Sequence, residues 1–186
     1  MKLIIGLGNP EARYSGTRHN VGFAVLDDFA RAHDAAWKNS PKFKALTAEI
    51  TVEDEKILLI KPTTYYNLVG ESARALIDFY KIEPIDVLII HDDLALPLGT
   101  IRTRHGGSDG GNNGLKSLAA HIGSGTYRLR IGVWSEMHEQ AEKTTIVLGD
   151  LSKQESGVLA AQKAKISSII SAFCTNTFDA TTVRST

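Results

Sequence analysis

Cysteine is nearly absent from this chain of 186 residues, and the single Cys174 excludes an internal disulfide. Cys174 lies in an apolar stretch, so we interpret it as a packing residue rather than a reactive thiol. The sequence also lacks a run of about 18 apolar residues, which a membrane-spanning helix needs. The first residues lead directly into a short apolar segment and do not resemble a signal peptide. We therefore expect a cytoplasmic protein without a membrane segment.

The motifs of several enzyme classes are missing as well. The six histidines are scattered, and neither an H-E-x-x-H pair nor a cysteine cluster is present to bind a metal. No G-x-S-x-G elbow is found, which disfavours serine catalysis. The dinucleotide fingerprint fails because Glu11 stands where its third glycine is needed, and Leu115 and Lys116 replace the ending of a P-loop. These absences disfavour metal-dependent hydrolysis, nicotinamide binding and nucleotide hydrolysis.

Length and composition indicate one ordinary globular domain spanning residues 1–186. The chain is 42% hydrophobic and contains no repeat, low-complexity stretch or Pro/Ser-rich linker. Strand-like and helix-like segments alternate, which favours an α/β fold. The expected strands cover residues 3–5, 46–52, 56–60, 87–90, 101–104 and 127–133. The expected helices cover residues 18–34, 67–80, 113–122 and 154–173, the last as one long amphipathic helix.

Basic residues are concentrated in one segment although the whole chain is neutral, with 21 basic and 21 acidic residues. Between positions 100 and 132 a single acidic residue, Asp109, accompanies five basic ones, which gives this segment a charge of +4. The five are Arg102, Arg104, Lys116, Arg128 and Arg130. Such a run is usually a solvated face, but it is also what a polyanionic partner requires.

Four polar blocks adjoin the predicted strands, where open α/β sheets bind their ligands. The first joins a Gly-Leu-Gly-Asn-Pro turn at 6–10 to Arg-His-Asn at 18–20, and the second covers residues 62–67 at a helix start. The third, residues 91–94, follows the most buried strand, and its carboxylates are either loop caps or partners for a base. The fourth, residues 106–114, is glycine-rich enough to let its backbone approach a ligand closely or to cradle phosphate.

Taken together, the four blocks resemble those of bacterial peptidyl-tRNA hydrolases, whose signatures are similar to G-L-x-N-P…Y…T-R-H-N, P-T-T-x-M-N, H-D-x-L-x-x-P and G-G-x-x-G-H-N-G-L. The resemblance runs from Lys2 to about Gly132. It implies a monomeric three-layer α/β/α domain with a twisted mixed sheet. It also implies an enzyme without metal or cofactor that hydrolyses the ester between a peptide and the 3′-terminal ribose of tRNA.

The chemistry of ester hydrolysis independently favours His19. Water needs a base near neutral pH, and histidine is the side chain that titrates in this range. A lone histidine is more often structural, but His19 is accompanied at predicted strand and helix ends by Asn9, Asn20, Asn67 and Asn113. Asp92 is predicted to accept a hydrogen bond from one ring nitrogen of His19, which leaves the other nitrogen free to take a proton from water.

The remaining site residues are implied by the resemblance alone. Asn9 is expected to distinguish a substrate with an acylated amino group from free aminoacyl-tRNA. The residues expected to contact the peptidyl-adenosine end are Tyr14, Tyr65, Tyr66, Asn67 and Asn113. Arg104 and Arg130 are expected to bind the region of the tRNA 5′-phosphate, for which the forked guanidinium is well suited.

The chain departs from the family pattern at several points. Tyr66 replaces the usual methionine and Asn112 the usual histidine, while Asp109 places a negative charge in a loop that faces a polyanion. The segment after Gly132 lacks the usual Gly/Pro loop, so we expect the lid before the last helix to be rebuilt. Two alternative functions remain: a non-catalytic RNA-binding relative, and a general esterase, for which the basic segment would be unnecessary.

Overall fold

A computed structural model describes residues 1–136, 139–179 and 181–183. In these residues eight strands form one mixed sheet in the order β2-β3-β4-β1-β5-β7-β6-β8. The strands are β1 (Lys2–Gly6), β2 (Lys38–Ser40), β3 (Ala45–Val52), β4 (Glu55–Pro62), β5 (Val87–Pro97), β6 (Ile101–His105), β7 (Tyr127–Trp134) and β8 (Thr182–Val183). The central strands β4, β1, β5 and β7 are parallel, and the outer pairs are antiparallel.

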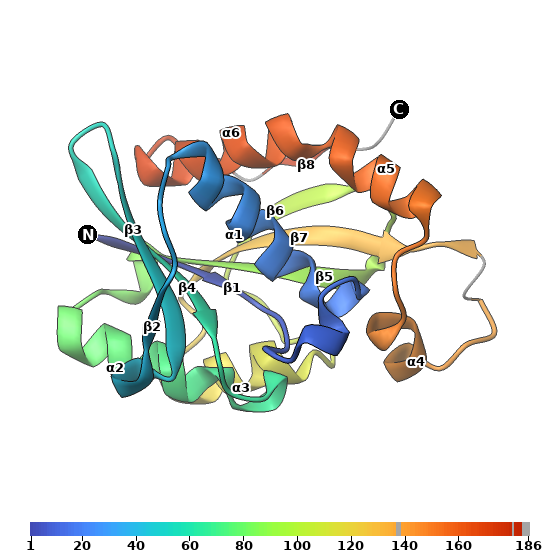
Figure 1. Ribbon diagram of the computed structural model, residues 1–186, viewed down its shortest axis with the longest axis horizontal. Helices are drawn as coiled ribbons and strands as arrows, with labels where there is room; N and C mark the ends of the chain where they lie inside the picture. Colours follow the sequence, from blue (N-terminus) through green and yellow to red (C-terminus); the bar gives the residue numbers. More distant parts are fainter. Residues whose placement is uncertain (137–138, 180, 184–186) are drawn as a thin grey trace.

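Helices cover both faces of the sheet (Figure 1). One face carries α1 (Val21–Ala32), α5 (Lys153–Ala161) and α6 (Lys163–Cys174), and the other carries α2 (Val69–Tyr80) and α3 (Asn113–Ile122). A short α4 (Lys143–Leu148) lies beyond the sheet, and single 3-10 turns form η1 (Ala12–Tyr14), η2 (Arg18–Asn20), η3 (Pro41–Phe43), η4 (Tyr66–Leu68) and η5 (Pro84–Asp86). The predicted three-layer α/β/α domain is confirmed. Within the described residues, no helix is long and apolar enough to cross a bilayer.

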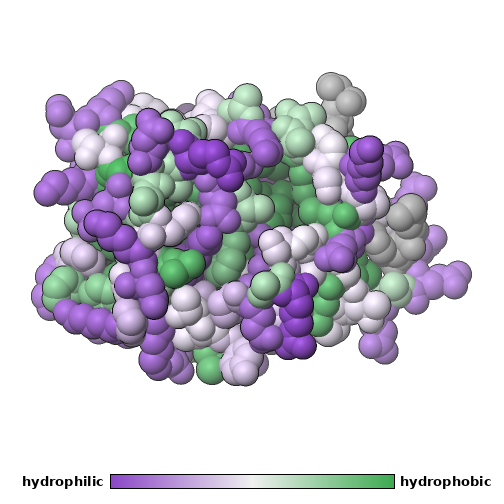
Figure 2. Space-filling view, in the orientation of Figure 1, coloured by the Kyte–Doolittle hydropathy of each residue, from purple (hydrophilic) through white to green (hydrophobic). Residues whose placement is uncertain are grey.

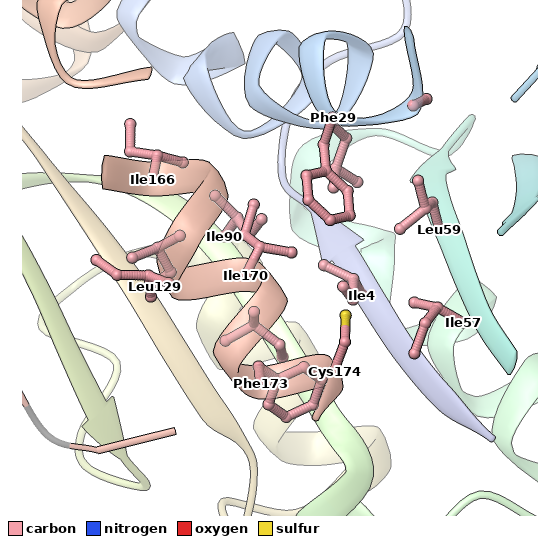
Figure 3. Packing of buried hydrophobic residues seen from close by; sticks show 14 of the residues in the cluster. Ile4, Phe29, Ile57, Leu59, Ile90, Leu129, Ile166, Ile170, Phe173 and Cys174 are labelled. Carbon is pink, nitrogen blue, oxygen red and sulfur yellow. The ribbon is translucent and has the colours of Figure 1, made fainter. Parts of the chain in front are cut away.

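Two hydrophobic clusters fill the spaces between the layers because alternate strand residues point to opposite faces of the sheet. On the face of α1 and α6, Ile4 and Ile90 meet Phe29 and Ile170 (Figure 3). Cys174 belongs to this cluster and has no exposed surface, and burial raises the pKa of its thiol to about 12. The interpretation of Cys174 as a packing residue is therefore confirmed.

The predicted strand at 87–90 was too short, because β5 continues to Pro97. Its extension pairs with β7 as far as Asp93, and a bulge follows before Pro97 pairs with Trp134. Gly132 makes this possible, since a Cβ there would lie 2.0 Å from the carbonyl oxygen of Pro97. The block at 91–94 therefore lies within a strand rather than in a loop after it.

The helix predicted over 154–173 is also wrong, because the chain forms two helices that meet at Gln162. The apolar pattern suggested that both halves bury a hydrophobic face. In α5, however, the buried residue is Glu155, while α6 buries Ile166, Ile170 and neighbouring apolar side chains against the sheet. Leu159 of α5 is partly buried and packs against the same apolar cluster as α6, so α5 combines an apolar contact with a buried carboxylate.

The other predicted elements are confirmed within a few residues. The hairpin of β3 and β4 is antiparallel, and α3 has the predicted bounds. The helices predicted over 18–34 and 67–80 each begin with a 3-10 turn, so α1 starts at Val21 and α2 at Val69. The strands β2 and β8 and the helix α4, which are short, were not predicted.

An apolar hollow of about 400 Å³ lies between α1 and α6 on the face seen in Figure 2. Val25, Phe29, Ile166 and Ile170 line it, and charged side chains such as Lys163 stand at its rim. It lies apart from the polar blocks of the sequence.

Candidate functional site

The polar blocks meet around a cavity of about 950 Å³ at the carboxyl ends of β1 and β5. In Figure 1 this is the end of the sheet at which η2, α4 and the start of α3 lie. All ten predicted site residues line the cavity: Asn9, Tyr14, His19, Tyr65, Tyr66, Asn67, Asp92, Arg104, Asn113 and Arg130. Segments far apart in the sequence are thus brought together as the resemblance implies.

His19 and Asp92 are in contact at the centre of this cavity. The Nδ1 atom of His19 lies 2.9 Å from Oδ1 and 3.0 Å from Oδ2 of Asp92. The carboxylate is buried, whereas 15% of the imidazole side chain remains exposed. Because an ionised carboxylate only accepts hydrogen bonds, Nδ1 carries a proton, and the lone pair of the neutral imidazole is then on Nε2. The arrangement is that of a base oriented by an acid.

Asn9 is held in place by a reciprocal clamp with Asn20. The backbone N–H of Asn9 donates to Oδ1 of Asn20 at 2.8 Å, and Nδ2 of Asn20 donates to the carbonyl of Asn9 at 2.9 Å. The side-chain oxygen of Asn9 accepts from the backbone N–H of Tyr66 at 3.3 Å. Its amide nitrogen is then the group that a ligand in the cavity can meet. Asn20, which belongs to the first polar block, thus has a structural role here.

Tyr66 is the most constrained of the predicted ligand contacts. Its ring stacks on the imidazole of His19, with centroids 3.6 Å apart and planes inclined by 16°. Its hydroxyl donates to Oδ1 of Asp92 at 3.1 Å and accepts from Nδ2 of Asn112 at 2.9 Å. Burial, followed by the charge of Asp92, raises the pKa of the Tyr66 hydroxyl well above its ordinary value. The hydroxyl therefore remains protonated and is engaged inside the protein.

The other predicted contacts are open to the cavity. Tyr65 is 66% exposed, and Asn67 in η4 and Asn113 at the start of α3 are exposed as well. Tyr14 is half-buried in η1, and the guanidinium of Arg13 lies 4.8 Å from its ring centre. These side chains line the same cavity as the pair of His19 and Asp92.

Arg128 supports the glycine-rich loop rather than forming part of a basic surface. It is 4% exposed, and its two terminal nitrogens donate to the carbonyl oxygens of Ser108 at 2.6 Å and Gly107 at 2.7 Å. Burial and the neighbouring Arg104 and Arg130 lower its pKa. Of the five basic residues in the +4 segment, Arg128 thus holds the loop from inside.

The two predicted phosphate ligands differ in their surroundings. Arg104 is exposed, and its guanidinium packs over Gly107, where a Cβ would lie 2.5 Å from Cζ. Arg130 is partly buried and donates from Nε to Asp93 at 2.7 Å, so its position is fixed by an ion pair. Lys116 and Lys143 also line the cavity. Besides the base, the lining of the cavity therefore carries several cations.

The departures in the loop have local structural roles. A carboxylate oxygen of Asp109 accepts from the backbone N–H of Gly111 at 2.8 Å, and its carbonyl accepts from Asn112 at 3.0 Å. Asn112 caps α3 by accepting from the N–H of Leu115 at 3.0 Å. The loop thus delivers the start of α3 to the cavity in a defined geometry.

Arg18 and Glu155 were not predicted, and they hold the segment around α4 over the cavity. One terminal nitrogen of Arg18 donates bidentately to Glu155 at 2.6 and 2.7 Å. The other donates to the carbonyl oxygens of Ile146, Gly149 and Asp150. Burial opposes ionisation of Glu155, but hydrogen bonds from Arg18 and Ser152 outweigh it and lower its pKa.

Of the pair of Arg18 and Glu155, a sequence pattern marks Glu155 alone. Ser152 and Glu155 form a capping box that marks the start of α5. Nothing local links Glu155 to Arg18, which lies 137 positions away. The segment following Gly132 includes residues 137–138, which lie outside the described part of the chain. The rebuilt lid therefore stays a prediction.

His91 is a second histidine at the cavity that sequence reasoning left unassigned. It is 2% exposed, and its Nδ1 donates to the backbone carbonyl of Asp92 at 2.7 Å. Burial lowers its pKa below the ordinary value, so it is neutral at pH 7. Its Nδ1 contact fixes the backbone beside the carboxylate. Among the described residues no group of three or more potential metal ligands is found.

Comparison with known proteins identifies the family. The family model described as "Peptidyl-tRNA hydrolase" matches residues 3–186. The chain belongs to the peptidyl-tRNA hydrolase family. It is 46% identical to a peptidyl-tRNA hydrolase of Listeria welshimeri over 174 residues, which cover 93% of each chain. It is 45% identical to one of Synechocystis over 157 residues, which cover 83% of this chain and 79% of the other.

Solved structures of the peptidyl-tRNA hydrolase family share the fold. The enzyme from Acinetobacter baumannii superposes with a TM-score of 0.87 at 34% identity, covering 95% of this chain and 89% of that one. A purine nucleoside phosphorylase from Toxoplasma gondii reaches a TM-score of 0.58 at 10% identity, which is a likeness of fold alone. The resemblance that the four polar blocks indicated is thus confirmed over nearly the whole chain.

Proposed function

We propose that this chain hydrolyses peptidyl-tRNA, releasing the peptide and returning the tRNA from abandoned translation to use. The observation that carries the proposal is the contact of His19 with Asp92 at 2.9 Å in the cavity where the family's motifs meet. Family membership supports the substrate class, and the cations that line the cavity supply the charge that a polyanion needs.

His19 acts as the general base in this proposal. Its Nε2 takes a proton from a water as the water oxygen attacks the ester carbonyl, and the resulting imidazolium is stabilised by Asp92. The imidazolium then returns the proton to the 3′ oxygen of the ribose as the bond from that oxygen to the acyl carbon breaks. These steps require only side chains of this protein, water and the substrate.

Asn9 supplies the selectivity for a blocked amino group. Its amide nitrogen faces the cavity from a clamped backbone, so it can donate to the carbonyl of an N-acyl group, which free aminoacyl-tRNA lacks. The side chains proposed to contact the peptidyl-adenosine end are Tyr14, Tyr65, Tyr66, Asn67 and Asn113. Tyr66 contributes a ring that forms a wall of the cavity, since its hydroxyl is bonded internally.

Arg104 and Arg130 are proposed to bind phosphates near the 5′ end of the tRNA. Arg104 is exposed, and Arg130 keeps its terminal nitrogens for a ligand while Nε binds Asp93. A protein that acts on tRNA in translation is expected to work in the cytoplasm. One chain holds every residue of the proposed mechanism, so a monomer suffices.

The test is deacylation of N-acetylated and of free aminoacyl-tRNA by the purified protein in EDTA. The proposal predicts rapid cleavage of the acetylated form only. Asn9→Asp keeps the oxygen that accepts from Tyr66 but loses the amide donor. This variant should lower the ratio of the cleavage rates of acetylated and free aminoacyl-tRNA. Tight tRNA binding with cleavage of neither form would indicate an RNA-binding protein. Cleavage of simple esters at the same rate, without salt dependence, would indicate a general esterase.

A further inference from the structure

We propose that Tyr66 is a positioning residue for the hydrolytic pair, and that Asn112 holds it in that role. This inference rests on the proposed function, in which His19 is the base. The two positions are those at which the chain departs from the methionine and histidine of the family pattern. In the structure the two side chains are joined by a hydrogen bond, so we treat the two departures as one interacting pair.

The direction of each hydrogen bond follows from the chemistry of the groups. The amide nitrogen of Asn112 can only donate, so the Tyr66 oxygen accepts from it at 2.9 Å. The Tyr66 proton is then directed to Oδ1 of Asp92 at 3.1 Å. The same carboxylate oxygen accepts from His19. A continuous chain of hydrogen bonds therefore connects the start of α3 to the imidazole.

Tyr66 also touches the imidazole directly. The two rings lie nearly parallel at 3.6 Å, so the phenol limits rotation of His19 about its χ angles while leaving one face to the cavity. Methionine could fill this space but would offer neither a flat surface nor a hydroxyl. Tyr66 thus orients both members of the pair, the base through its ring and the acid through its hydroxyl.

The packing around Tyr66 makes this arrangement rigid. The side chain is 6% exposed, and a Cβ at Gly114 would lie 2.6 Å from its Cε1 atom. The absence of a side chain at position 114 therefore lets the ring lie against α3. Asn112 is fixed in turn because its oxygen caps α3 through Leu115. Each group that positions Tyr66 is itself held by the helix.

The Asp92 carboxylate accepts hydrogen bonds from both the Tyr66 hydroxyl and His19. Without the Tyr66 donor, the carboxylate interacts more strongly with a protonated His19. The imidazolium form is then favoured. The acidic limb of the pH profile of kcat/KM should then move to higher pH. The carboxylate also loses one of its fixed contacts, so the base is oriented less well and kcat falls.

The experiment compares Tyr66→Phe, Asn112→Ser and the double variant on N-acetylated aminoacyl-tRNA. Phenylalanine keeps the stacked ring and removes only the hydroxyl. Serine keeps a helix cap of similar strength but does not reach Tyr66. Tyr66→Phe should lower kcat about tenfold, as expected for one hydrogen bond to a charged group, with KM nearly unchanged. Asn112→Ser should lower kcat less, and should have no further effect in the Tyr66→Phe background.

A matched control is Tyr80→Phe, which removes a phenolic hydroxyl from the end of α2 and leaves the lining of the cavity intact. It should keep the wild-type kcat and the wild-type pH profile. Thermal unfolding of each variant controls for a loss of fold. An equal loss of kcat in Tyr80→Phe and Tyr66→Phe would overturn the positioning role.

Wild-type activity separates this inference from the proposed function, because inactive wild-type protein would refute the proposed function itself. With active wild type, an unchanged kcat in Tyr66→Phe, or a raised KM alone, would overturn the positioning role. So would a lower kcat with an unmoved acidic limb, or additive effects in the double variant.

Discussion

Replacing Arg18 with methionine tests whether one buried ion pair holds α4 over the cavity. The Arg18 and Glu155 side chains are 5% and 6% exposed, and their bidentate contact is at 2.6 and 2.7 Å. Methionine fills much of the volume but leaves the Glu155 carboxylate buried without its partner. Removing one member of a buried pair costs about 3–5 kcal/mol of unfolding free energy.

A second substitution separates the loss of unfolding free energy into a contribution from the unpaired charge and one from packing. Glu155→Leu alone leaves the guanidinium with only its carbonyl acceptors, which are those of Ile146, Gly149 and Asp150. In the double variant neither charge is buried alone, so most of the loss should be recovered. The single Arg18→Met change should lower the Tm by roughly 10 °C in a domain of this size.

Urea unfolding gives these free energies, and hydrogen exchange reports the local effect. Amides of α4 should exchange faster in Arg18→Met than in wild type, and those of α2, on the other face of the sheet, should lose protection only to the extent of the global destabilisation. An unfolding free energy within about 0.5 kcal/mol of wild type would refute the reasoning, since surface substitutions fall in that range. A double variant as unstable as the sum of both singles would refute it as well.

Other parts of the molecule give three further predictions. Arg104→Ala should raise KM several-fold and reduce the salt slope of tRNA binding by about one, whereas Arg31→Ala on α1 should change neither; equal effects of both would contradict a local phosphate site. His91 has a lowered pKa in the folded state, so the unfolded chain binds its proton first and stability falls as the pH drops below about 6.5. His91→Asn, which keeps a donor near the Asp92 carbonyl, should flatten this dependence in urea titrations at about pH 5 to 7, and an unchanged slope would count against it. Gly132→Ala should destabilise by about 2–3 kcal/mol, because its Cβ would lie 2.0 Å from a carbonyl oxygen of β5; a neutral effect on the Tm would show that the strands separate easily.

Much of the fold could be predicted from local patterns in the sequence. The β-branched run before His91 marked the central strand, and Asn112 to Gly114 marked the start of α3 within one residue. The contact between His19 and Asp92 could also be predicted, because parallel strands end at the same edge of the sheet.

The remaining features depend on tertiary contacts that no local pattern reveals. The extension of β5 requires the close approach of Gly132, which belongs to the next strand of the sheet, β7. The last helix is divided at Gln162, where neither a proline nor a glycine marks the break, and Glu155 of α5 pairs with Arg18, 137 positions away. Tyr66 was predicted as a ligand contact, and its bonds to neighbouring side chains became visible only in three dimensions.

In the proposed function, His19 activates water for ester hydrolysis. Single-turnover deacylation of N-acetylated aminoacyl-tRNA by His19→Ala, with tRNA affinity measured in parallel, tests it most directly. The rate should fall by several orders of magnitude, of the size seen when a member of a catalytic triad is removed, while tRNA affinity stays within about twofold. A variant that retains the wild-type rate, or that loses tRNA binding together with turnover, would refute the role of His19 as the base.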